Sequence, residues 1–124
     1  VNVSLPENMM VKGNPTLLTS IFKNLTDNAI AYSGGRDIYI NATLNNSDAY
    51  TITVGDNGIG VDEEHIGHIF ERFYRIDKGR SRKLGGTGLG LSIVKNAVLF
   101  HGGDIEVYNR KTGGLEFKFT LPKA

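Results

Sequence analysis

The chain of 124 residues contains no cysteine, and its charge is almost balanced, with 14 Lys and Arg against 13 Asp and Glu. The absence of cysteine excludes disulfide bonds and thiolate metal sites, and it suits a reducing compartment. Because the net charge is only +1, neither nucleic acid nor an anionic membrane is expected as the main partner.

The sequence also lacks long apolar segments. No run approaches the roughly 20 apolar residues that cross a bilayer, and no charged-then-apolar signal segment opens the chain. We therefore expect no direct membrane insertion. The length suits a single domain over residues 1–124. The first residue is Val1 rather than methionine, and it opens an apparent strand, so we expect the chain to be a piece of a larger protein.

Hydrophobic patterning predicts six short strands. Alternating or short apolar runs, separated by turn residues, mark residues 1–5, 9–11, 37–44, 50–56, 104–109 and 115–122. Within the third of these strands, alternation predicts one buried face, formed by Ile38, Ile40, Ala42 and Leu44. The last two predicted strands form a hairpin around the turn sequence KTGG.

Two segments have the period of a helix instead. The first spans residues 14–33, with Asn14 as a candidate N-cap, Pro15 at the first helical position and a GG pair beyond its end. The second spans about 89–100 and ends at the sequence HGG, residues 101–103.

Residues 57–87 have little regular structure apart from a helix-like stretch, EEHIGHIFERF, at 63–73. Long loops of this kind are commonly lids or binding loops. The order of strands, helix, strands, lid, helix and strands predicts an α+β fold. We expect a two-layer sandwich with helices on one face of a mixed sheet.

Two asparagines, Asn24 and Asn28, lie one turn apart on the first predicted helix and therefore share a face. Their carboxamide oxygens can bind a hard divalent cation or water without adding negative charge beside a polyphosphate. The alternative is that both side chains simply face solvent.

The sequence DNGIG at 56–60 follows a predicted strand directly. Gly58 and Gly60 permit unusual backbone angles and the close approach of a ligand, while Asp56 can accept a hydrogen bond from an amino group. A plain turn also explains this sequence. A calcium loop does not, because the EF-hand spacing and its final glutamate are missing.

A second glycine-rich sequence, GGTGLG at 85–90, runs directly into the second predicted helix. Such a turn exposes unpaired backbone N–H groups at the positive end of the helix dipole, which favours anions. It matches neither the Walker pattern nor the dinucleotide fingerprint, and the other segments of a protein kinase are absent. The alternative is a flexible loop before a helix.

Basic side chains gather between the two glycine-rich sequences. Residues 72–83 hold six of the 14 Lys and Arg residues and a single acid, Asp77. They form either a solvated surface or a positive electrostatic field that attracts phosphate, in which an arginine binds terminal phosphate oxygens through two hydrogen bonds. The rings of Phe70, Phe73 and Tyr74 are expected to anchor this loop to the core, which is consistent with closure over a ligand.

In their order and spacing, four of these stretches resemble the boxes of the catalytic and ATP-binding domain of bacterial sensor histidine kinases. NLTDNAIAYS (24–33) resembles the N box, DNGIG the first glycine box, FERFYR (70–75) the F box, and GGTGLGLSIVK (85–95) the second glycine box. The resemblance covers essentially the whole chain. It implies the GHKL (Bergerat) fold, Mg-ATP as the bound nucleotide, and transfer of the γ-phosphate to a histidine.

The resemblance also implies roles for individual residues. Asp56 would bind the adenine amino group. Asn28 would hold the magnesium ion with help from Asn24, and Tyr32 would lie near the ribose and base. The pocket floor would be shaped by Gly58, Ile59 and Gly60. The phosphates would be met by Arg75, Lys78, Gly86, Thr87, Gly88, Leu89 and Gly90.

Asn24 and Arg75 are the candidate catalytic residues. Hydrolysing relatives carry a glutamate base where this sequence has Asn24. Because an amide cannot usefully accept a proton near neutral pH, we expect transfer to another acceptor rather than hydrolysis.

The implied partners are ATP and ADP, the dimerisation and phospho-acceptor domain of the same protein, and a downstream response regulator. The implied location is the cytoplasmic portion of a membrane-anchored sensor. His65, His68 and His101 lack the sequence of a phospho-acceptor box. The chain alone is therefore not expected to autophosphorylate.

The sequence departs from the family pattern at two places. Ala31 stands where many members carry Lys or Arg, and KTGGLEF (111–117) lacks the usual small hydroxyl residue after its last glycine pair. Two alternatives therefore stay open: a nucleotide-binding interaction module without turnover, and an ATPase or anti-sigma serine kinase on the same fold.

Overall fold

The computed structural model describes residues 2–7, 9–32, 37–45, 48–58, 60, 62–71, 90–111 and 113–123. The elements are β1 (Asn2–Ser4), α1 (Pro15–Tyr32), β2 (Ile38–Asn45), β3 (Ala49–Asp56), α2 (Glu63–Ile66), α4 (Gly90–Phe100), β4 (Ile105–Asn109) and β5 (Leu115–Pro122). Among these residues, no helix is both long enough and apolar enough to span a bilayer.

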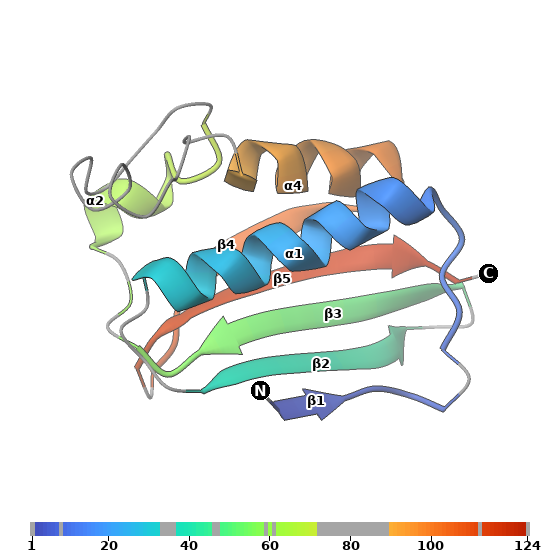
Figure 1. Cartoon of the computed structure of the whole chain (residues 1–124), viewed down its shortest axis with the longest axis horizontal. Coiled ribbons are helices and arrows are strands. Elements are labelled where there is room, and N and C mark those ends of the chain that lie inside the picture. Colours follow the sequence, from blue (N-terminus) through green and yellow to red (C-terminus); the bar gives the residue numbers. More distant parts are fainter. Residues whose placement is uncertain are drawn as a thin grey trace.

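The described strands form one mixed sheet in the order β1-β2-β3-β5-β4. β1 pairs with β2 in parallel, and the other neighbouring strands pair antiparallel. Helices α1 and α4 lie against one another on one face of this sheet (Figure 1). The predicted two-layer α+β sandwich is confirmed.

Helix α1 begins as its sequence predicts. The N–H of Leu17 donates to the side-chain Oδ1 of Asn14 at 3.1 Å, which satisfies one of the unpaired amides of the first turn. Pro15 is the first helical residue, where its missing N–H removes no helical hydrogen bond. The GG pair predicted to stop this helix, Gly34-Gly35, lies outside the described residues.

The core lies between the sheet and the two long helices. Ile21 and Leu25 of α1 are 0% and 1% exposed, and Val94 and Val98 of α4 are completely buried. Their spacing of four residues places each pair on one helical face. The sheet closes the core with side chains that alternate along its central strands, namely Tyr50, Ile52, Val54, Leu115, Phe117, Phe119 and Leu121.

Helix α4 ends at the predicted glycines. Gly102 has a φ of 81°, a left-handed conformation that glycine adopts without steric cost. The N–H of Gly102 donates to the carbonyl of Leu99 at 3.0 Å, and that of Gly103 donates to the carbonyl of Val98 at 3.1 Å. These bonds satisfy carbonyl groups that the last helical turn leaves unpaired.

Three details of the predicted fold are wrong. Residues 9–11 form no strand, because only Val11 pairs, in an isolated antiparallel bridge to Lys123. Leu44 is 46% exposed rather than buried. It lies beyond Asn41, where the pairing of β2 with β1 ends, so one flank of its side chain is open.

The third incorrect prediction is the length of the helix-like stretch at residues 63–73. The helix is only Glu63–Ile66, with Gly67 as its C-cap, and the described residues after it form turns. Glycine is a poor helix former and interrupts the pattern here.

Candidate functional site

Asn24 lies beside the first residue of α4. Its Nδ2 donates to the carbonyl of Ser20 at 2.8 Å, and its Oδ1 faces Gly90. A Cβ atom on Gly90 would lie only 3.2 Å from that Oδ1. The fold therefore brings the asparagine face of α1 against the start of α4, which the predicted phosphate site requires.

Asn28 follows one turn later on α1 and is half-buried, as is Asn24. Neither side chain is simply a solvated surface group. Tyr32 is the last residue of α1, and this end of α1 lies on the same side of the fold as the end of β3 (Figure 1).

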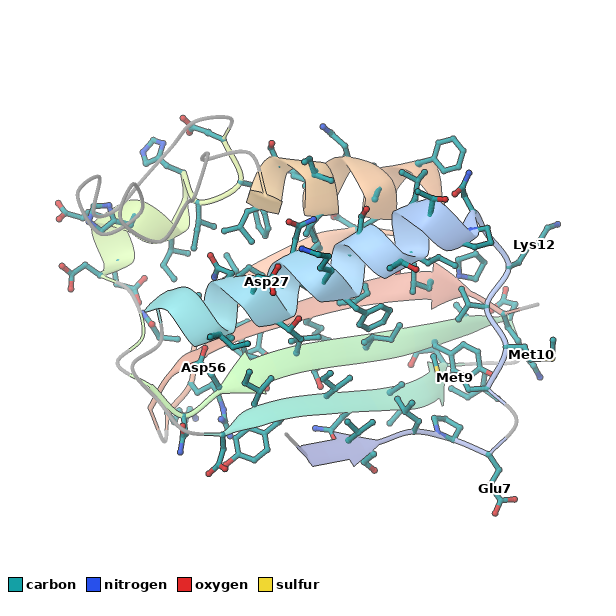
Figure 2. The ribbon with its side chains drawn as sticks, in the orientation of Figure 1. Glu7, Met9, Met10, Lys12, Asp27 and Asp56 are labelled. Atoms are coloured by element: carbon teal, nitrogen blue, oxygen red, sulfur yellow. The ribbon has the colours of Figure 1, made fainter. Side chains whose placement is uncertain are left out.

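Asp56 is the last residue of β3 and is only 5% exposed (Figure 2). Its Oδ1 accepts hydrogen bonds from the N–H of Gly58 at 2.8 Å and from the N–H of Leu115 at 3.4 Å. Within the described residues, both bonds end on this one oxygen. The two bonds hold the carboxylate through Oδ1.

The loop after Asp56 is held at its start by Asn57. The N–H of Asp37 donates to the side-chain Oδ1 of Asn57 at 3.1 Å, and the N–H of Asn57 donates to the carbonyl of Asp37 at 3.3 Å. Gly60, at the far end of the loop, has a φ of 73°, which glycine favours. A Cβ at Gly60 would also lie 2.5 Å from the side-chain oxygen of Asn109, which would have to move.

The β4–β5 turn packs directly behind this loop. Gly113 and Gly114 have φ values of 107° and 93°. A side chain on Gly114 would overlap the main chain of Asp56. The turn region that lacks the family's usual hydroxyl residue is therefore in contact with the candidate adenine-binding carboxylate, and it supplies the N–H of Leu115.

Sequence reasoning missed Arg110, which precedes this turn. Its Nη1 donates to the backbone carbonyl of Asp56 at 2.7 Å. Its guanidinium carbon lies 4.9 Å from the ring centre of Tyr39, a cation–π distance. A single arginine after a predicted strand carries no local signal of such a role, because the contact depends on the pairing of distant strands.

Tyr108 and Glu116 face one another directly across β4 and β5, behind the site. The phenol donates a hydrogen bond to the carboxylate of Glu116. This bond, together with desolvation and the negative charges of Glu116 and Glu106, raises the pKa of Tyr108 to about 12.

Phe70 supports the expectation that rings anchor the loop to the core. It is half-buried and packs against Phe117, with ring centres 5.9 Å apart. The ammonium group of Lys95 lies 5.7 Å from the centre of the Phe70 ring, which links this segment to α4. Phe73 and Tyr74 lie outside the described residues.

Several predicted site residues lie outside the described part of the chain. They are Ile59, Arg75, Lys78, Gly86, Thr87, Gly88 and Leu89. Of the predicted phosphate-binding glycines, Gly90 is described, as the first residue of α4.

The three histidines lie at peripheral positions. His101, after the end of α4, is within 2.7 Å of the carbonyl of Ala97 through Nδ1, and its Nε2 accepts the N–H of Asn14 at 3.0 Å. His65 lies in α2, and His68 approaches the carboxylate of Glu71 at 2.5 Å. None of them lies next to Asn24 or Asp56 in the chain or in the contacts described above.

The sequence matches the family described as histidine kinase-, DNA gyrase B- and HSP90-like ATPase over residues 13–124. It is 41% identical over 122 residues to the sensor-like histidine kinase SenX3 of Mycobacterium tuberculosis, covering 98% of this chain and 30% of SenX3. Over 122 residues it is also 39% identical to the sensor histidine kinase WalK of Bacillus subtilis, covering 96% and 20%.

The structure resembles solved sensor kinases. The mycobacterial sensor histidine kinase MprB matches with a TM-score of 0.82 at 29% identity, over 98% of this chain and 80% of the MprB chain. Full-length ShkA in complex with AMPPNP matches with a TM-score of 0.80 at 25% identity, over 99% and 26%.

The chain therefore belongs to the histidine kinase-, DNA gyrase B- and HSP90-like ATPase family. The relatives named above are sensor histidine kinases. The chain spans about a third or less of the length of SenX3 and WalK.

Proposed function

We propose that this chain binds Mg-ATP and, within a larger sensor kinase, transfers the γ-phosphate to a histidine. The acceptor lies on a separate dimerisation and phospho-acceptor domain, from which phosphate passes to a response regulator. The observation that carries the proposal is the contact of Asn24 with Gly90. It joins a helix that offers carboxamide oxygens to the amino end of a helix, where phosphate groups are stabilised.

Adenine selection is assigned to Asp56. A buried carboxylate with one oxygen held by backbone N–H groups offers its other oxygen to the adenine amino group. Gly58, Ile59 and Gly60 would line the pocket floor, and Tyr32 would lie near the ribose and base.

Asn28, with help from Asn24, would hold the magnesium ion. The donor set fits, because amide oxygens are ligands of hard divalent cations. Since the Nδ2 of Asn24 is engaged by Ser20, its Oδ1 is the atom that faces the site. When bound, magnesium neutralises phosphate charge during transfer.

The amide at position 24 favours transfer of the phosphate over its hydrolysis. The amide of Asn24 cannot take a proton from water near neutral pH, so this position supplies no general base. Arg75, Lys78 and the amides of Gly86 to Gly90 would stabilise the phosphates, as charge-assisted bonds do.

A calorimetric titration with ADP tests nucleotide and metal binding together. We expect binding in magnesium and weaker binding in EDTA. Asn28→Ala should remove most of the difference between the two conditions, whereas Asn41→Ala, on an exposed position of β2, should keep it. No binding of ADP or ATP in the presence of magnesium would overturn the proposal.

Transfer is tested by adding a phospho-acceptor hairpin from a related kinase in trans with labelled ATP. We expect phosphohistidine on the hairpin, none on the chain alone, and negligible phosphate release. Bound ATP without transfer would favour an interaction module. Steady phosphate release by the chain alone would favour an ATPase.

A further inference from the structure

The side chain of Arg110 crosses the face of the sheet that lies opposite the helices and reaches the main chain of Asp56. Its main chain is fixed by the β4–β5 turn, where its N–H donates to the carbonyl of Gly114 at 2.8 Å. From there the half-buried side chain extends to the main-chain carbonyl of Asp56 and to the ring of Tyr39.

The side chain of Arg110 passes over Gly55 in this crossing. Gly55 pairs with Tyr39 on β2 and with Glu116 on β5, on the face opposite the helices. A Cβ atom there would lie 3.6 Å from the Cδ of Arg110 and 3.4 Å from the Oε1 of Glu116. Gly55 is buried although its neighbours Thr51 and Thr53 on the same strand are only half-buried. The arginine side chain is part of what covers it.

Three neighbouring groups of the β4–β5 turn thus contact Asp56. Arg110 binds its carbonyl, Gly114 packs against its main chain, and the N–H of Leu115 binds its carboxylate. Because Arg110 lies on the face opposite the helices and the side chain of Asp56 projects to the helix-covered face, Arg110 need not touch a nucleotide.

We propose that Arg110 is a positioning residue that aims the Asp56 carboxylate at the amino group of a purine and thereby sets nucleotide selectivity. The inference rests on the adenine contact of Asp56 proposed above. A planar guanidinium can stack on Tyr39 and donate to a carbonyl at the same time, which fixes the orientation of the bond. Loss of this bond removes one of the restraints on the peptide of Asp56, and a charged hydrogen bond weakens when its geometry is lost.

The test compares two ligands: ADP, and purine riboside 5′-diphosphate, which lacks the 6-amino group. The unchanged protein should bind ADP roughly tenfold or more tightly than the analogue, as expected for one hydrogen bond to a charged group. Arg110→Met should bind the analogue with unchanged affinity and lose most of its preference for ADP. Lys111→Met, which removes the same charge from the next, exposed residue, should keep the preference.

Each result has one meaning. If Arg110→Met weakens both ligands equally, or keeps the full preference for ADP, Arg110 is a structural residue only and the inference fails while the Asp56 contact stands. If the unchanged protein binds both ligands equally, the adenine role of Asp56 fails and this inference with it.

Two further variants keep the test decisive if Arg110→Met does not fold. Arg110→Lys retains the charge without the planar donor, and Tyr39→Leu removes the ring on which the guanidinium stacks. Both should reduce the preference for ADP, with melting temperatures measured alongside. Full preference in both folded variants would overturn the inference.

Discussion

At the scale of single residues, Asp56 is the centre of the proposed site. It is buried at a strand end, and two backbone N–H groups bind one of its oxygens. Burial of a carboxylate is costly unless it is hydrogen-bonded, and these two bonds offset part of that cost. In the proposed function, the amino group of adenine donates to the second oxygen.

Asp56→Asn should therefore separate binding from folding. The amide keeps an oxygen for Gly58 and Leu115, so the melting temperature should change little. It loses the charged acceptor, so the affinity for ADP should fall roughly tenfold or more. Calorimetric titration and thermal unfolding measure the two effects. Asp27→Asn, an exposed position on α1 beside Lys23, should leave the affinity unchanged, and unaltered affinity in Asp56→Asn would refute the assignment.

At the scale of elements, glycines set the ends of helices and strands for two different reasons. Gly102 ends α4 with a φ of 81°, and no atom lies within 4 Å of a Cβ built there. Gly114 has a φ of 93°, and a Cβ there would also overlap the main chain of Asp56. The first position requires only a backbone conformation, and the second requires space as well.

Replacement of each glycine by alanine should show this difference. Gly102→Ala should lower the free energy of unfolding by about 1–2 kcal/mol, the cost of a left-handed conformation. Gly114→Ala should cost clearly more, because the turn must move away from Asp56, and it should also weaken ADP binding. Urea denaturation and calorimetry measure both. Equal losses of stability in the two variants would contradict the close packing at Gly114.

The β4–β5 pair contains a group that titrates at an unusual pH. The hydrogen bond to Glu116, with desolvation and nearby carboxylates, raises the pKa of Tyr108 from 10.0 to about 12. The unfolded chain releases this proton near pH 10, so the stabilisation is complete below pH 10 and is lost as the pH rises through 12. The ring is 38% exposed, so solvent screening makes the effect small.

Tyr108→Phe tests this titration. Wild type should be slightly more stable than the variant at pH 8, and the difference should shrink as the pH approaches 12. Ultraviolet titration should show a tyrosine step well above the ordinary range, and this step should be missing in the variant. Glu116→Gln should return the step towards pH 10. A Tyr108 step at the ordinary pH in wild type would disprove the raised pKa.

At the scale of the whole molecule, the proposed site exists only where distant parts of the chain meet. Asn24 of α1 contacts the start of α4. Arg110, which follows β4, reaches across β5 to the end of β3. A second long-range contact joins the start of α1 to the end of α4, because His101 accepts the N–H of Asn14. The contacts of Asn24 with Gly90 and of Asn14 with His101 hold α1 and α4 in a fixed relation above the sheet.

Local physical chemistry was enough to predict the elements. Helix α1 follows from Asn14, Pro15 and a period of three to four apolar residues, and the end of α4 follows from Gly102, since these effects act within one or two turns. The order and spacing of the four boxes, namely 24–33, 56–60, 70–75 and 85–95, were also enough to indicate the family.

Only the tertiary structure decided which residues share a site. Leu44 has the alternation of a buried residue, yet it is exposed because β1 does not extend beside it. Arg110 has no distinctive neighbours in sequence, yet it holds Asp56. Both outcomes depend on strand order and length, which arise from packing between distant segments, and no local pattern of residues encodes that packing.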